Sequence, residues 1–212
     1  MAGFFRPSRR VFLFRVCRLL LVAGGAAMTA CDGSATGQSW RRLGLRILPR
    51  GAHPLVIAIG AGLAFGAYMA LADAILFRDV TPAAQIALVA GSSALERIAH
   101  FARLAVLDEL EFRLVAMSII AWLLVSVAGK QAWCFWAAIL LTALVVFPAF
   151  HLPYLSALTP SFPTALREIM LHGGAGILWG YLYWRHGLVA AIAAHVSAHL
   201  SLQPLLAIGP MH

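Results

Sequence analysis

Long uninterrupted runs of apolar residues are the feature that most constrains how this chain can fold. In water such runs would expose far more hydrocarbon than a soluble domain tolerates, whereas in a bilayer they form spanning helices. Apolar residues make up 62% of the chain and charged residues 11%, against roughly 45 to 50% and about 25% in soluble domains. We therefore predict an all-α, polytopic membrane helix bundle of about six to seven hydrophobic helices. The runs cover residues 54–77, 104–128, 132–151, 165–184 and 187–208, and a less apolar segment, interrupted by Gly91-Ser92-Ser93, covers 82–103.

The first 50 residues carry two competing signals. Ser8-Arg9-Arg10 resembles the start of a twin-arginine export signal, residues 19–30 have the length of a signal-peptide apolar region, and Met28-Thr29-Ala30-Cys31 resembles a lipobox. Basic residues before an apolar stretch also describe a first membrane anchor, which is the interpretation we favour in a polytopic protein. We expect residues 1–50 to be this anchor or signal-like segment with a basic linker, and residues 51–212 to be one helical bundle.

The charge distribution favours a membrane surface as the polar partner of the chain. The formal net charge of +8 comes from arginines and one lysine, most of which lie outside or at the ends of the apolar runs and suit anionic lipid headgroups. No aromatic and basic pattern of a nucleic-acid-binding module is present, so we expect the lipid bilayer and no nucleic acid as a partner. Cys17, Cys31 and Cys134 are too scattered for a disulfide framework or a thiolate metal site. We expect an integral protein of a bacterial inner (plasma) membrane.

Three acids and an arginine interrupt the apolar run at 104–128. In the segment Asp108-Glu109-Leu110-Glu111-Phe112-Arg113, each charge would cost about 2.5 to 3.5 kcal/mol at the bilayer centre, so these side chains should face the bundle interior or a wet cavity. Helical spacing puts Glu109 and Arg113 one turn apart in the order that favours an ion pair, and turns Asp108 about 100° away from Glu109. Taken alone, the pattern fits a catalytic acid group and a structural or interfacial ion pair equally well.

Three histidines lie in two other apolar runs. His151 follows Pro148, which should kink the helix and free a carbonyl, and precedes Pro153, which should end it. His195 and His199 should present two imidazoles on one helical face, at the spacing that zinc-binding helices use. A lone histidine such as His151 is more often structural, and the pair also fits a polar patch bonded to neighbouring helices.

In this order, the three patterns resemble the CAAX protease and bacteriocin-processing family of intramembrane endopeptidases, also called the Abi family. Its members carry Glu-Glu-x-x-x-Arg, Phe-x-x-x-His and His-x-x-x-Asn. This chain carries Asp108-Glu109-x-x-x-Arg113, Phe147-x-x-x-His151 and His195-x-x-x-His199. The segment from Gly180 to Ile192 also resembles the approach to the last motif, so that the resemblance extends over roughly residues 100 to 205.

The resemblance implies an endopeptidase that cleaves a membrane-anchored protein or peptide near its C-terminal part. It implies general base catalysis, in which a carboxylate and an imidazole activate the attacking water and other polar groups steady the oxyanion. No cofactor is certain, and both a metal-free mechanism and a zinc mechanism stay open. By this resemblance, Asp108 and His151 activate the water, Glu109 and Arg113 support the first motif, and His195 and His199 orient the water or the oxyanion.

Two positions depart from the pattern of the family. Asp108 stands in place of glutamate and withdraws the carboxylate by about 1.5 Å, which leaves open that Glu109 or Glu111 is the base, or that the protein is weak or inactive. His199 stands in place of asparagine and forms, with His151, His195 and an acid, a candidate zinc set. The rival hypotheses are non-catalytic: a membrane scaffold, a relative that binds an anchored peptide without cutting it, or a transporter-like bundle.

Overall fold

The computed structural model of this chain describes residues 43–208. The chain separates into two compact units, Met1–Gly44 and Leu45–His212, and the helices named below all belong to the second. The hypotheses that residues 1–42 hold a signal-like segment or an anchor lie outside the described residues.

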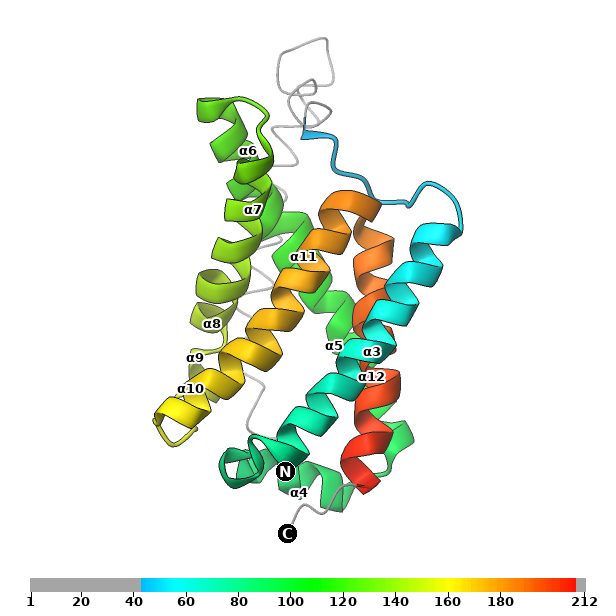
Figure 1. The fold of residues 1–212 in the computed structure, drawn as a ribbon, viewed down its shortest axis with the longest axis vertical. Helices are drawn as coiled ribbons and strands as arrows, with labels where there is room; N and C mark the ends of the chain where they lie inside the picture. The colour runs from blue at the N-terminus through cyan, green and yellow to red at the C-terminus, as the bar shows by residue number, and fades with distance from the viewer. Residues whose placement is uncertain (1–42, 209–212) are drawn as a thin grey trace. The chain divides into compact units, whose positions relative to one another are not determined.

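Every regular element of the described residues is a helix, which confirms the all-α prediction (Figure 1). Side chains such as Ile75 and Val127, 73% and 91% exposed, form the apolar outer surface that lipid tails require. The expected number of six to seven hydrophobic helices is not confirmed. Four helices of the described residues are long and apolar enough to cross a membrane: His53–Ile75, Ala94–Ala128, Ala132–Phe150 and Leu188–Ile208.

The elements follow one another with short joints. The first group is α3 (His53–Ile75), η1 (Arg78–Val80) and α4 (Ala83–Gly91), followed by the continuous helix α5 (Ala94–Asp108), η2 (Glu109–Met117) and α6 (Ser118–Ala128). The second group is α7 (Ala132–Leu141), η3 (Thr142–Val146), α8 (Phe147–Phe150), α9 (Leu152–Leu155), α10 (Phe162–Glu168), η4 (Ile169–Gly173), α11 (Gly174–His186) and α12 (Leu188–Ile208).

The helix that carries the acids begins earlier than predicted. We expected separate segments over 82–103 and 104–128, but the chain breaks at Ser92-Ser93 and then runs as one helix of 35 residues to Ala128. Ser93 starts it with a capping box, in which the Ser93 hydroxyl accepts from the Glu96 N–H (3.3 Å) and the Glu96 carboxylate accepts from the Ser93 N–H (2.8 Å). No glycine or proline follows before Gly129, so nothing ends the helix near residue 103.

Each of the three helices that include η2, η3 and η4 widens into a π-helical segment. One of these segments, η3, ends at Val146 and includes the turn before Pro148. The proline ring lacks an N–H and clashes with the carbonyl one turn earlier, so the wider turn accommodates it. The helix ends at His151, where the backbone leaves helical geometry (φ −103°, ψ 16°). Pro153 lies in the first turn of α9, so the prediction that it ends the preceding helix is wrong.

Helix α12 is the central element, because it packs against α3, α5 and α11. At two glycines of α3, the backbones of the two helices come into direct contact. A Cβ atom added to Gly62 or Gly66 of α3 would lie 2.1 Å from the carbonyl oxygen of Ala194 or Ala198, respectively. Small residues at helix interfaces allow such close approach in membranes, and this contact fixes the depth and rotation of α12.

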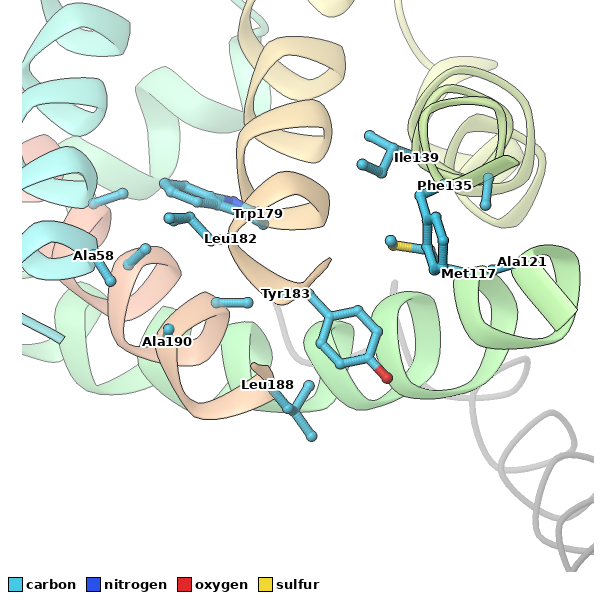
Figure 2. Packing of buried hydrophobic residues seen from close by; sticks show 14 residues of the cluster. Ala58, Met117, Ala121, Phe135, Ile139, Trp179, Leu182, Tyr183, Leu188 and Ala190 are labelled. Atoms are coloured by element: carbon cyan, nitrogen blue, oxygen red, sulfur yellow. The ribbon is translucent and has the colours of Figure 1, made fainter. Parts of the chain in front are cut away.

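The core lies on both sides of α11. Figure 2 shows Met117, Phe135 and Ile139 on one side of this helix, and Ala58 and Ala190 on the other. Trp179 and Tyr183 of α11 are themselves 1% and 3% exposed. Helix α11 therefore joins the half of the bundle built on α6 and α7 to the half built on α3 and α12.

Candidate active site

A buried acid, an arginine and a histidine meet where η2 faces α12. Glu109 is 1% exposed. Its Oε1 lies 2.9 Å from Nδ1 of His195, and its Oε2 lies 3.4 Å from Nε of Arg113. Arg113, 3% exposed, donates from Nη2 to the carbonyl of Gly176 on α11 (3.2 Å). The predicted Glu109–Arg113 ion pair is confirmed, and it ties three helices together in the bundle interior.

Four aromatic rings form a stacked column through this group. Trp179 stacks on His195 (centroids 5.6 Å apart, 19° between planes), His195 on His199 (5.4 Å, 26°), and His199 on Phe101 of α5 (5.1 Å, 13°). The expectation that His195 and His199 share one helical face is confirmed. The flanking rings hold the planes of both imidazoles, and the contacts of Nδ1 with Glu109 and Gln203 orient the rings within those planes.

His199 continues into a chain of buried polar contacts toward the beginning of α5. Its Nδ1 lies 3.4 Å from Nε2 of Gln203, one turn later on α12. Gln203 in turn accepts from Nε of Arg97 (3.1 Å) at its side-chain oxygen and from Nη2 of Arg97 (2.8 Å) at its main-chain carbonyl. The sequence analysis missed both Arg97 and Gln203, because they lie 106 residues apart in the chain.

His151 lies beside the same π-helical segment, on the side of Phe112. Its ring stacks on Phe147 (4.0 Å) and lies 5.9 Å from the ring of Phe112. Its Nδ1 lies 2.9 Å from the carbonyl oxygen of Phe147. Asp108, half-buried, precedes Phe112 by one helical turn, and residues one turn apart share a helical face. Asp108 and His151 therefore lie on the side of η2 that bears Phe112, while Glu109 turns toward α12.

Three buried polar atoms of this site have no hydrogen-bond partner within residues 43–208. They are Oε2 of Glu109 and Nε of Arg113, which form only the ion pair with each other, and Nε1 of Trp179. Buried polar groups of folded proteins are rarely left unpaired, and those that are call for an explanation such as function. Glu109 and Trp179 are both in contact with His195.

A second buried polar cluster, absent from our sequence analysis, joins α3, α4, α9 and α10. Arg167, 2% exposed, donates to both carboxylate oxygens of Asp73 (2.8 and 2.9 Å) and to the side-chain oxygen of Gln85 (2.8 Å). It also pairs with Glu168 (2.6 Å), which accepts from the hydroxyl of Tyr154 (3.2 Å). Burial, and then the Glu168 carboxylate, raise the pKa of Tyr154 to about 12, so this hydroxyl stays protonated and donates.

The histidines do not form the candidate zinc set. A structural or catalytic zinc site needs at least three protein ligands around one point. Within the described residues, no group of three His, Cys, Asp or Glu side chains is placed to hold a metal ion. The Nδ1 atoms of His151, His195 and His199 each face a different protein partner.

The fold and this site define a class, namely polytopic membrane proteins that hold an acid, an arginine and histidines inside a helix bundle. The model of the family described as "Type II CAAX prenyl endopeptidase Rce1-like" matches residues 90–201. This match covers more than half of the chain, and the chain belongs to that family of proteases, as the three motifs predict. None of the curated proteins and none of the solved structures matches the chain.

Proposed function

We propose that this protein is an intramembrane endopeptidase that cleaves a membrane-anchored protein or peptide near its C-terminal part. The observation that carries the proposal is the buried contact between Glu109 and His195. A carboxylate held inside a membrane bundle is costly, so by default it marks a functional site. The family description names prenyl substrates, so a prenylated C-terminal peptide is the first substrate to test.

In this mechanism, Asp108 and His151 activate a water molecule for attack on the peptide carbonyl. The proton leaves the water for this acid and imidazole as the C–O bond forms, and it then passes to the amine as the C–N bond breaks. Glu109 orients His195 and is itself held by Arg113. His195 and His199 orient the water and stabilise the oxyanion, which gains most from donors already fixed in place.

The mechanism as proposed has no zinc-dependent step, and chelation tests this. We expect the purified protein to keep its activity after treatment with a chelator and to carry no stoichiometric zinc by elemental analysis. Loss of activity that added zinc restores would instead support the metal mechanism left open by the sequence.

The decisive experiment is cleavage of a prenylated peptide in liposomes of anionic bacterial lipids, which match the inner membrane that we propose as its location. The variants Asp108→Asn and His151→Gln should lose cleavage, because each removes a group that accepts the proton of the water. Asp79→Asn and His53→Gln make the same chemical changes at exposed residues and should keep it. Full activity in both site variants would overturn the proposal.

A second candidate function is favoured by one specific observation, the aspartate at position 108. If its shorter side chain cannot reach the water, the protein would bind an anchored peptide without cutting it. The same liposomes separate the two functions, because such a relative would retain the labelled peptide intact and release no product.

A further inference from the structure

The three histidines of the site are bonded at Nδ1 to partners of different chemistry. Nδ1 of His151 faces the carbonyl of Phe147, and Nδ1 of His195 faces the carboxylate of Glu109, each at 2.9 Å. A carbonyl and an ionised carboxylate only accept hydrogen bonds. Nδ1 therefore carries the hydrogen in both rings, and Nε2 of each neutral imidazole holds a lone pair that can accept from water.

His199 faces the opposite kind of partner. Its Nδ1 lies 3.4 Å from Nε2 of Gln203, an amide nitrogen that only donates. Nδ1 of His199 must then be the acceptor, which leaves the hydrogen of the neutral ring on Nε2. The stacked rings of Phe101 and His195 hold the plane of this imidazole, and the contact with Gln203 orients the ring within it.

Arg97 fixes which end of the Gln203 amide faces His199. Nε of Arg97 donates to Oε1 of Gln203 at 3.1 Å, and a guanidinium has no acceptor atom, so the amide cannot turn over. Arg97 is itself held by the carbonyls of Val89, Ser92 and Gln203. Both side chains are buried, at 2% and 3% exposed, and no solvent competes for these contacts.

We propose that Arg97 and Gln203 are positioning residues that hold His199 with its hydrogen on Nε2, so that it donates to the oxyanion of the reaction. This inference rests on the proposed function and extends it to residues outside the three motifs. It also explains the exchange of asparagine for histidine, since the asparagine amide and Nε2–H of this tautomer are both neutral donors. The same tautomer leaves Nε2 of His199 without the lone pair that a zinc ligand needs.

The tautomer can be tested on the whole protein without any substrate. In protein labelled with nitrogen-15 at histidine and held in detergent micelles at about pH 8.5, where imidazole is neutral, the ring nitrogens report which atom carries hydrogen. The His199→Asn variant identifies the signals by their loss. We expect His199 to have a protonated Nε2 and a bare Nδ1. The reverse pattern would overturn the inference, even if the protein cleaves no peptide.

The consequence for catalysis is tested by Gln203→Glu, which keeps the shape of the side chain but offers His199 an acceptor. The hydrogen of His199 should then move to Nδ1, and kcat should fall by up to about a hundredfold, the loss typical of one oxyanion donor, with KM little changed. Gln131→Glu makes the same change at an exposed residue and should leave kcat unchanged.

The effect of Gln203→Glu in a His199→Asn background distinguishes a positioning role of Gln203 from a role in packing. The reference for this comparison is the kcat of the His199→Asn variant itself, in which the asparagine amide donates without a tautomer to be chosen. In that background, Gln203→Glu should cost little further activity. An equal loss from Gln203→Glu in both backgrounds would show that Gln203 acts on packing instead and would overturn the inference. If wild-type protein cleaves nothing while the tautomer is as expected, the proposed function fails and the assignment of His199 stands.

Discussion

Asp108 is one methylene shorter than the glutamate that the family carries at this position. The carboxylate is thereby withdrawn by about 1.5 Å, and a misplacement of about 1 Å can cost about a hundredfold in rate. We expect Asp108→Glu to raise kcat in the liposome assay, because the longer side chain reaches farther toward the water beside His151. Single-turnover cleavage of the prenylated peptide measures the change.

Glu111→Asp and Glu111→Gln accompany this experiment, because Glu111 is the other half-buried acid of the segment. Neither should reproduce the effect of Asp108→Ala, which should abolish cleavage. A lower rate in Asp108→Glu would show instead that the helices are spaced for the shorter acid.

Glu109 contacts both His195 and Arg113, and its effect on cleavage can be separated from its effect on stability. Glu109→Gln leaves the buried guanidinium of Arg113 without its countercharge and should destabilise the protein by about 3 to 5 kcal/mol, seen as a lower unfolding midpoint in detergent. Adding Arg113→Gln should recover most of this stability. Both the single and the double variant should lack cleavage, because His195 no longer donates to a carboxylate. Recovery of both properties would show that the pair is only structural.

At the scale of elements, the approach of α3 to α12 sets the position of His195. Gly62→Ala would place a Cβ 2.1 Å from the carbonyl oxygen of Ala194, so the helices must separate. We expect a loss of about 1 to 3 kcal/mol in stability together with a fall in kcat, since Ala194 adjoins His195. Gly60→Ala lies on the same helix, and its Cβ would meet nothing within 4 Å. It should stabilise the protein by about 0.5 to 1 kcal/mol, as thermal unfolding of both variants will show.

The sequence predicts most helices, and it predicts those contacts of the site that join residues one helical turn apart. Apolar runs locate α3, α7 and α12, and helical spacing predicts both the Glu109–Arg113 pair and the shared face of His195 and His199. The start of α5 could have been found as well, because Ser93 and Glu96 have the spacing of a capping box. The contact of Glu109 with His195, 86 residues apart, has no signal in local spacing. It depends on how the helices pack, so only the order of the family motifs suggested it.

Across the described bundle, two buried polar networks hold different sets of helices. The first joins η2, α11, α12 and the beginning of α5 through Arg113, Glu109, His195 and Gln203. The second joins α3, α4, α9 and α10 through Asp73, Gln85, Tyr154 and Arg167. Since α3 packs directly on α12, the second network supports the site through α3 without contributing a group to it.

This division predicts that the second network acts on stability and not on chemistry. Asp73→Asn keeps the size of the side chain but removes the charge that neutralises Arg167, so we expect about 3 kcal/mol of destabilisation and a lower unfolding midpoint. Asp79→Asn, an exposed acid nearby, should shift the midpoint little. Assayed well below its midpoint, Asp73→Asn should keep the kcat of the wild type, because Asp73 bonds to Gln85 of α4 and Arg167 of α10 and not to the residues of the site. A fall in kcat without a fall in stability would instead join the two networks into one site.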